Sequence, residues 1–399
     1  MPEMNRRNFL IASVGAVGVA AGAAVTIPML LEQGEQRPLA TDKGVLVILT
    51  LYGGNDGINT VVPYADNAYH DARPELAFAP NEVIDIDGHF GFNPSLTGLN
   101  DLWHSKKLAI VRGVGYPKQD RSHFRSMDIW QTASPEQPIS TGWIGRWLDA
   151  TGDDPLRAIN VGSVLAPMAV GEKRLASALS ANIPLIPNDI TGILTAMSRS
   201  DDHDTPAMEA VRNTYRTNRT TGHALNQFAA SSPPADEQSD AGKRLADDLE
   251  LVARCIKARV PTQVYMVSLG GFDTHADERG DHQRLLKSVD NALTPFLHQM
   301  QSNSYGHNVT VMVYSEFGRR VHGNASHGSD HGAAAPVFIA GPAVKGGFYG
   351  DEPSLTDLVD GDLKTTTDFR DVYYELLTRS LGADPTPVVG SGRRNIGFL

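Results

Sequence analysis

The sequence of 399 residues contains a single cysteine, Cys255. One thiol forms no intramolecular disulfide, and it rules out a zinc cluster built from several cysteines. Cys255 lies within an expected helix with no catalytic partner nearby in the sequence, which indicates a role in core packing. The fold must therefore be stabilised by its buried core, to which a bound metal can add.

The chain also lacks an excess of basic residues. Its 35 Lys and Arg are outnumbered by 46 Asp and Glu, so the formal net charge is -11 at pH 7. Proteins that bind nucleic acid hold clusters of Lys and Arg against the phosphate backbone, and such clusters are absent here. We therefore expect no nucleic acid partner. The hydrophobic share of 41% is sufficient for a packed globular interior.

The N-terminus carries an export signature. Arg6 and Arg7 precede an uncharged stretch, residues 9–31, that is rich in Ala, Gly and Val, a pattern typical of the bacterial twin-arginine route. The stretch is long enough to span a bilayer, but its Gly and Ala make it a poor anchor. We interpret residues 1–40 as a twin-arginine signal and linker, and we expect a periplasmic or extracellular protein without a stable membrane span after processing.

Apolar runs and helical stripes alternate along the chain. We expect strands at 44–51, 108–111, 263–269, 309–314 and 335–340, and helices at 123–131, 241–258, 281–301 and from about 367. Strands joined by helical crossovers are parallel, so their carboxyl ends meet at one edge of one sheet. The sequence predicts an α/β fold, with a mostly parallel sheet flanked by helices, in a single domain spanning 41–399.

One region has a different composition. Residues 132–138 and 231–240 are rich in Pro, Ser and acidic residues, as is typical of loops and linkers. We interpret about 133–240 as an insertion that forms a cap over the site.

Carboxylate and imidazole side chains follow the ends of the expected strands. The candidate metal ligands are Asp56, Asp273, His275, Glu316 and His331. Such side chains are common ligands of divalent cations, and ligands bind at the carboxyl edge of open α/β sheets. The sequence therefore predicts a site for one or two divalent metal ions of unknown identity. The alternatives are an ordinary Gly-Asn-Asp-Gly turn at Asp56 and a helix cap at Asp273.

A second group of polar residues opens the helix at 123–131. Ser122 and His123 lie between Arg121 and Arg125, an arrangement that suits a nucleophile beside a pocket for a phosphate or sulfate group. These four residues are the catalytic candidates. The alternative for Ser122 is a helix cap, the commonest role of serine at a helix start.

The segments together resemble a known family. The matching motifs are Gly-Gly-Asn-Asp-Gly-Ile-Asn-Thr at 53–60, Arg-Ser-His-Phe at 121–124, Gly-Gly-Phe-Asp-Thr-His at 270–275, Ser-Glu-Phe-Gly-Arg at 315–319 and Ser-Asp-His-Gly at 329–332. With the leader, they resemble an uncharacterised family of exported bacterial proteins, a domain of unknown function grouped with the sulfatase and alkaline-phosphatase superfamily. The resemblance implies an alkaline-phosphatase-like fold, with the five ligand candidates holding metal and Ser122 as nucleophile.

Two positions depart from that superfamily's pattern. Phe317 follows Glu316 where the hydrolases commonly have a further imidazole. The cysteine motif of formylglycine sulfatases is absent, and Cys255 lies in the wrong context, so that class is excluded.

The sequence predicts an exported, metal-dependent hydrolase that acts on small or polymer-borne phosphate or sulfate esters. The alternative is a non-catalytic exported binding protein on the same fold with a degraded metal site.

Overall fold

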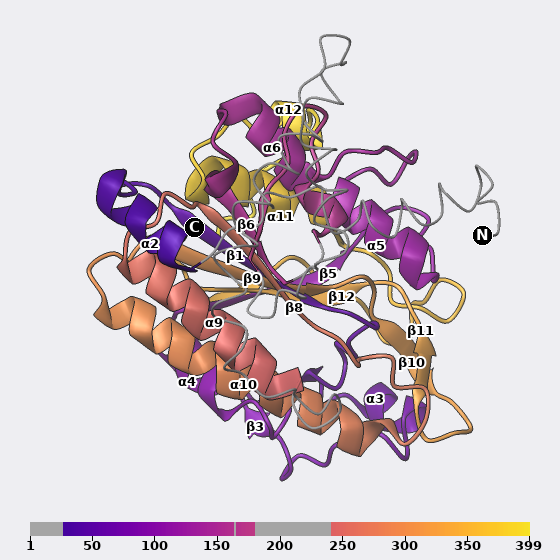
Figure 1. Ribbon diagram of the computed structural model, residues 1–399. Coiled ribbons are helices and arrows are strands. Elements are labelled where there is room, and N and C mark those ends of the chain that lie inside the picture. Colours follow the sequence, from indigo (N-terminus) through magenta and orange to yellow (C-terminus); the bar gives the residue numbers. More distant parts are fainter. Residues whose placement is uncertain (1–26, 163–164, 180–240) are drawn as a thin grey trace, which may run out of the picture.

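The central feature of the computed structural model, which describes residues 27–162, 165–179 and 241–399, is a nine-stranded sheet (Figure 1). Its strands are β1 (Val45–Leu51), β5 (Leu108–Gly115), β6 (Ala158–Val161), β7 (Ser177–Leu179), β8 (Val264–Leu269), β9 (Val309–Ser315), β12 (Ala335–Ala340), β13 (Gly347–Tyr349) and β14 (Thr367–Asp368). The strand order is β13-β5-β12-β9-β1-β8-β6-β7, and β14 pairs with β5.

Two smaller sheets lie beside the central one. They are formed by β2 (Val61–Val62), β3 (Ile84–Asp85) and β4 (Gly91–Phe92), and by the pair β10 (Arg319–Gly323) and β11 (Ser329–His331). The antiparallel β10-β11 pair forms part of the connection between β9 and β12.

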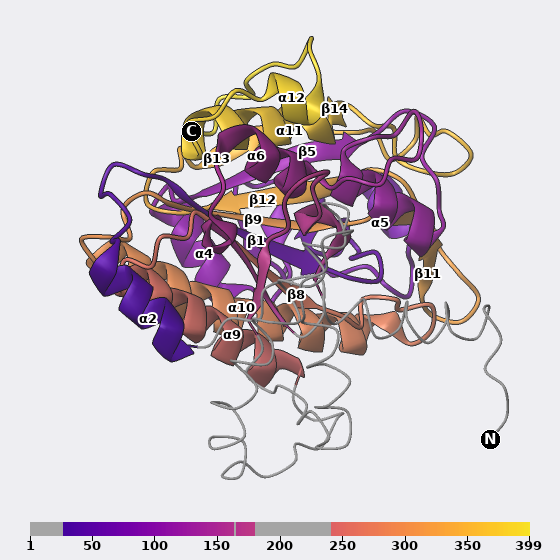
Figure 2. The same ribbon diagram turned by 45° about the horizontal axis from the view of Figure 1, so that its top comes forward.

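Helices cover both faces of the central sheet (Figures 1 and 2). On one face lie α2 (Ile27–Gln36), α4 (Thr97–His104), α9 (Ala241–Lys257) and α10 (Glu278–Ser302), and on the other α5 (His123–Thr132), α6 (Trp143–Thr151), α11 (Phe369–Glu375) and α12 (Thr386–Val389). The remaining helical segments are α3 (Asn67–Ala72), η1 (Pro155–Arg157), η2 (Pro167–Ala169) and η5 (Leu376–Ser380). The expected helices are thus confirmed, with shifts of a few residues at their ends.

Burial on both faces explains the continuous apolar run of β1. Val47 and Leu49 pack in the cluster under α9 and α10, whereas Leu46 and Ile48 pack in the cluster that contains Trp143 of α6. Successive residues of a strand point to opposite faces, so a strand covered on both sides must be apolar at every position.

The prediction of a mostly parallel sheet is confirmed. β1 runs parallel to β8 and β9, and β6 runs parallel to β7 and β8. β12 is the exception, because it pairs antiparallel with both β5 and β9. The chain returns from β9 to β12 through the short β10-β11 pair, and a connection without a crossover helix reverses the strand direction.

The expected insertion at 133–240 lies only partly within the described residues. Its first part contains α6 and two strands, β6 and β7, that extend the central sheet next to β8. Residues 180–240 lie outside the described part of the chain, so a cap over the site stays a prediction.

The expected export signal, with Arg6 and Arg7, also lies outside the described residues. None of the helices within the described ranges combines the length and the apolar character that a membrane span requires.

Candidate metal centre

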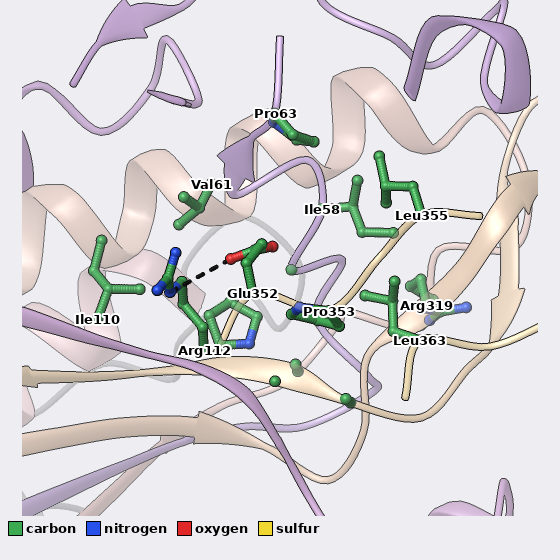
Figure 3. Close-up of a pocket in the computed structure, with 15 residues that line it drawn as sticks. Ile58, Val61, Pro63, Ile110, Arg112, Arg319, Glu352, Pro353, Leu355 and Leu363 are labelled. Carbon is green, nitrogen blue, oxygen red and sulfur yellow. Dashed lines mark ion pairs between the residues drawn. The ribbon is translucent and has the colours of Figure 1, made fainter. Parts of the chain in front are cut away.

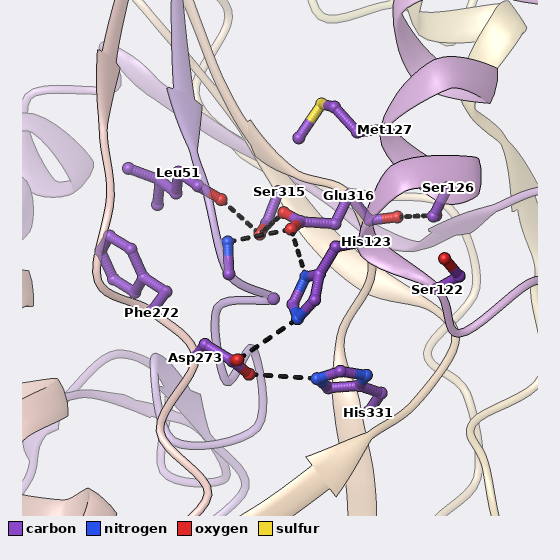
Figure 4. Close-up of polar contacts among 12 residues, drawn as sticks. Leu51, Ser122, His123, Ser126, Met127, Phe272, Asp273, Ser315, Glu316 and His331 are labelled. Carbon is purple, nitrogen blue, oxygen red and sulfur yellow. Dashed lines mark hydrogen bonds and ion pairs between the residues drawn. The ribbon is translucent and has the colours of Figure 1, made fainter.

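The ends of β1, β8 and β9 lie at one level of the sheet. Leu51, the last residue of β1, pairs with Leu269 of β8 and with Ser315 of β9. The segments that follow these three strands therefore start side by side, and they carry Asp273 and Glu316 to the same edge (Figure 4). This arrangement is the convergence expected from the parallel strands.

Three imidazole rings meet the carboxylate of Asp273 at this edge. Its Oδ1 lies 3.0 Å from Nε2 of His275 and 3.0 Å from Nε2 of His331, and these two nitrogen atoms are 2.9 Å apart. Its Oδ2 lies 3.4 Å from Nε2 of His123 (Figure 4). Donor atoms of His123, Asp273 and His331 all lie within 4.8 Å of one another.

The opposite nitrogen atoms of these rings face oxygen acceptors. Nδ1 of His123 lies 2.8 Å from Oε1 of Glu316, and Nδ1 of His331 lies 2.9 Å from the carbonyl oxygen of Arg121. Carboxylate and carbonyl oxygens only accept hydrogen bonds, so each Nδ1 donates, and each neutral ring keeps a lone pair on Nε2. This orientation of the ring by a second partner is the usual arrangement of metal-binding histidines.

The geometry of the donor atoms fits a divalent cation. Nδ1 of His275 also faces an oxygen atom, because it lies 3.4 Å from the carboxylate of Asp330. Nε2 of His123 is buried and has no hydrogen-bond partner among the described residues. An ion with bonds of about 2.1 Å holds neighbouring ligand atoms roughly 3.0 to 3.4 Å apart, and the contacts to Asp273 fall in this range. The donor set of His123, Asp273 and His331, with His275 beside it, suits Zn²⁺ or a similar metal.

The protonation states also suit metal binding. Burial tends to raise the pKa of Asp273, but the contact with His331 and the charge of Arg319 together bring that pKa below its usual value. Burial is the main cause that lowers the pKa of His331. At neutral pH the carboxylate is therefore ionised and the His331 ring is neutral, as ligands must be.

Glu316 is a predicted metal ligand, but in this structure it orients the ring of His123 instead. Its buried carboxylate accepts hydrogen bonds from the backbone N–H of Gly53 and the hydroxyl of Ser315, besides facing His123. These contacts leave it oriented toward Nδ1 of His123 instead of the shared centre. The ring of Phe317, which stands where the resemblance implied an imidazole, packs 5.0 Å from the ring of His123.

Asp56 is not brought to this centre. Its carboxylate is fully buried against the guanidinium of Arg73, with an Nη1–Oδ2 distance of 2.5 Å. It belongs instead to a second group of three potential ligands, with Glu278 and His282. Oδ1 of Asp56 and Oε1 of Glu278 are buried without a donor among the described residues. We call Asp56, Arg73, Glu278 and His282 the buried charge cluster.

The charges of this cluster balance when Glu278 is protonated. Burial and the charge of Asp56 raise the pKa of Glu278 to about 8. Burial lowers the pKa of His282 to about 4. Arg73 outweighs the effect of burial on Asp56 and lowers its pKa. At neutral pH the cluster therefore contains one ion pair, one carboxylic acid and one neutral imidazole.

The predicted catalytic residues around Ser122 lie at the rim of the centre. Ser122 precedes α5, and its exposed side chain makes no capping hydrogen bond. The guanidinium of Arg121 pairs with Asp362, and that of Arg125 pairs with Asp128. The two arginines, expected to form an anion pocket, are thus already bound to carboxylates. Ser122 remains next in sequence to His123, with a hydroxyl that the helix does not use.

Arg319 is a positioning residue, for which the sequence left open a carboxylate pair, a substrate contact or a solvated surface position. Its fully buried guanidinium also contacts Asp273, at 3.1 Å. It donates to the carbonyl oxygens of Gly53, Gly54, Phe272 and Ser329. Three segments that build the site are therefore held together by one side chain.

The sequence analysis did not identify Arg73, Glu278 and His282 of the buried charge cluster, and only two of them have a recognisable sequence pattern. Glu278 and His282 are four residues apart in α10, so they share one helix face, and this spacing could have indicated a common site. Arg73 lies in a loop with no local pattern that marks it.

A shallow cleft lies near the site but does not contain the donor residues (Figure 3). Its walls are mainly apolar, with Ile58, Val61 and Leu363 among them, and Arg112 and Glu352 form an ion pair at 3.6 Å within it. Arg319 lines the cleft and also contacts Asp273. The imidazole centre therefore stands beside this cleft at the strand ends.

Replacing Glu278 by Gln should weaken the dependence of stability on pH. The folded-state pKa near 8 lies above the ordinary value of 4.5, so the native state holds a proton that the unfolded state loses. The free energy of unfolding should therefore fall as pH rises from about 4.5 to about 8, by on the order of a few kcal/mol. Glu278→Gln cannot ionise and should remove most of this fall.

Urea unfolding at pH 6 and pH 9 measures the effect. Glu35→Gln, at an exposed position, serves as the matched control and should keep the wild-type slope. Equal slopes for wild type and Glu278→Gln would contradict the assignment of the proton.

Fold and site define an α/β protein with a candidate metal centre formed by His123, Asp273 and His331 at the strand ends, with His275 beside it. The chain belongs to the family described as "Protein of unknown function (DUF1501)", whose model matches residues 186–392. No curated protein matches the chain.

Several solved structures are similar to this chain at low identity. A protein in the alkaline phosphatase superfamily from Vibrio parahaemolyticus is 13% identical, with a TM-score of 0.45, covering 90% of this chain and 76% of that chain. The phosphonate monoester hydrolase SpPMH from Silicibacter pomeroyi is 11% identical, with a TM-score of 0.37, covering 89% and 76%. The PsFucS1 sulfatase from Pseudoalteromonas sp. is 8% identical, with a TM-score of 0.38, covering 92% and 76%.

Proposed function

We propose that this protein is an exported, metal-dependent hydrolase of phosphate or sulfate esters. The observation that carries the proposal is the convergence of three imidazole Nε2 atoms, from His123, His275 and His331, on the carboxylate of Asp273. Oxygen acceptors at Nδ1 of His123 and His331 leave the Nε2 lone pairs of these two rings available to a metal ion. A divalent cation held there would polarise the ester and offset the negative charge that develops during hydrolysis.

The first turn of α5 supports an anionic substrate. His123 is the first residue of this helix, and the N–H groups of a first turn have no helical partner and favour anions. The hydroxyl of Ser122 is exposed beside this turn and is the protein's candidate nucleophile, with water as the alternative. Arg121 and Arg125 add positive charge, and a substrate would compete with Asp362 and Asp128 for their guanidinium groups.

Export rests on the leader sequence. Arg6 and Arg7 precede an uncharged Ala- and Gly-rich segment, which supports recognition by the twin-arginine machinery and a periplasmic or extracellular location.

The proposal is tested by metal content and turnover together. We expect the purified mature protein to contain a divalent metal and to hydrolyse members of a panel of phosphate and sulfate esters, with loss of activity after chelation and recovery on addition of metal. Elemental analysis and product release measure the two quantities. A protein that holds no metal and turns over none of the esters would contradict the proposal.

The second candidate is a non-catalytic exported protein that uses the centre for binding. Glu316 is engaged with His123, and Phe317 packs on the same ring, so this part of the centre offers no further ligand. Metal binding without turnover of any ester would favour this candidate, whereas loss of turnover in a Ser122→Ala variant that still binds metal would exclude it.

A further inference from the structure

The arginines that flank His123 in the sequence are already paired with carboxylates of the protein. The guanidinium of Arg121 contacts Oδ2 of Asp362 at 2.5 Å, and the side chain of Asp362 is only 6% exposed. The guanidinium of Arg125 pairs with Asp128. A substrate that uses either arginine must first break an ion pair. Neither pair therefore adds a free positive charge to the metal centre.

Two further arginines, Arg319 and Arg320, contribute positive charge from fixed positions. Arg319 contacts Oδ1 of Asp273 at 3.1 Å, and its side chain is fully buried. It therefore strengthens the positive potential at the centre without being open to a substrate. Nε of Arg320 lies 3.7 Å from Oδ1 of Asp362, so Arg320 shares this carboxylate with Arg121. One positive charge remains from this group of three side chains.

Three carboxylates lie around the donor atoms. Besides Asp273, the buried carboxylate of Glu316 lies 2.8 Å from Nδ1 of His123. The carboxylate of Asp330 lies 3.4 Å from Nδ1 of His275. The rings that face the centre are thus supported by negative charges on their outer sides.

The centre is most open to solvent on the side of His275 and Asp330. Their side chains are 43% and 57% exposed, whereas those of His331 and Glu316 are 21% and 2% exposed. An anion that approaches from solvent therefore meets the charge of Asp330 on its way to the donor atoms.

The charges around one bound divalent cation leave about one positive charge. Positive charge comes from the cation, which carries two, and from the guanidinium groups of Arg319 and Arg320. Negative charge comes from the carboxylates of Asp273, Glu316 and Asp330. A substrate with one negative charge neutralises this remainder. A second negative charge leaves an excess in a partly buried site, where unpaired charge is costly.

We infer that the substrate carries one negative charge at its ester group, as a phosphate diester or a sulfate monoester does, and that Asp330 selects against a phosphate monoester. A phosphate monoester carries nearly two negative charges above about pH 6. The inference rests on the proposed function, because it takes the ester group to be bound at the cation. Asp330 acts here on specificity alone, since its charge meets the substrate from behind the ring of His275.

Hydrolysis of two esters that differ by one charge tests the inference. At pH 8, 4-nitrophenyl methylphosphonate has one negative charge and 4-nitrophenyl phosphate has two, and both release the same alcohol. After each kcat/KM is divided by the uncatalysed rate, the metal-loaded full-length protein should favour the singly charged ester about tenfold. Bis(4-nitrophenyl) phosphate and 4-nitrophenyl sulfate, measured in parallel, distinguish a diester substrate from a sulfate substrate.

Binding of ligands without an ester bond gives a readout that does not depend on turnover. Calorimetry at pH 9 compares dimethylphosphinate, with one charge, and methylphosphonate, with two. Because Coulomb energy is proportional to the charge of the ligand, Asp330→Asn should tighten binding of dimethylphosphinate about twofold and of methylphosphonate about fourfold. Metal content measured on the same samples shows that the variant retains its cation.

Glu35→Gln is the matched control, because α2 lies at the end of the molecule opposite α5 and β11 (Figures 1 and 2). It removes one negative charge and should leave the binding of both ligands unchanged. Faster normalised hydrolysis of 4-nitrophenyl phosphate, or equal effects of Asp330→Asn on the two ligands, would overturn the inference while hydrolysis still supports the proposed function. If no ester is cleaved, the proposed function fails and the inference fails with it.

Discussion

Replacing Asp273 by Asn should remove the bound metal and lower ester hydrolysis on the order of a thousandfold. Asp273 is the carboxylate to which the Nε2 atoms of His123, His275 and His331 converge. If the cation contributes about 4 kcal/mol of transition-state stabilisation, its loss corresponds to roughly three powers of ten in rate. Elemental analysis and initial rates at saturating metal measure the two effects.

Two further variants separate ligands from supporting residues. Glu316→Gln should weaken metal affinity by about 10- to 100-fold without abolishing binding, because Glu316 orients His123 through Nδ1. Asp128→Asn, at the surface pair with Arg125, is the matched control and should retain metal. Unchanged metal content in Asp273→Asn would show that the imidazole rings do not form a metal centre with this carboxylate.

Replacing Arg73 by Met should destabilise the protein by about 3 to 5 kcal/mol, because it leaves Asp56 as a buried charge without a partner. Both side chains of this ion pair are inaccessible to solvent. Arg73 also donates to the carbonyl oxygens of Arg320 and Val321. The substitution therefore removes support for β10, which precedes His331. Chemical denaturation at neutral pH measures the loss.

The control for this prediction is Arg125→Met. Its partner Asp128 is partly exposed, so the loss should be at most about 1 kcal/mol. Adding Asp56→Asn to Arg73→Met removes the unpaired charge and should recover part of the stability. Equal losses at Arg73 and Arg125 would contradict a special role for the buried ion pair.

The fold could be predicted well because its signals are local. The apolar run of β1 and the stripe of α10 follow from periods of two and 3.6 residues. The direction of β12 was not predicted, because it depends on how the short β10-β11 pair turns the chain. The hydrophobic periodicity that marks the strands does not indicate how the connecting segment turns.

The site could be predicted in outline. Asp273, His275 and His331 meet as expected, and His123, expected to serve catalysis beside Ser122, joins them. The position of Asp56 depended on Arg73, 17 residues further along the chain. No local sequence pattern identifies Arg73 as this partner. The sequence alone therefore could not show that the candidate ligands separate into an imidazole centre and a buried charge cluster.

The sequence by itself determined the parallel core strands, the acidic composition with one cysteine, and the delivery of carboxylate and imidazole residues to strand ends. Only the tertiary structure decided that Glu316 orients a histidine, that Arg73 pairs with Asp56 and that Arg319 holds three segments. The physical reason is that each role depends on which atom faces which partner at about 3 Å, as in a hydrogen bond. Those partners are as far apart in the chain as Gly53 and Glu316, 263 residues.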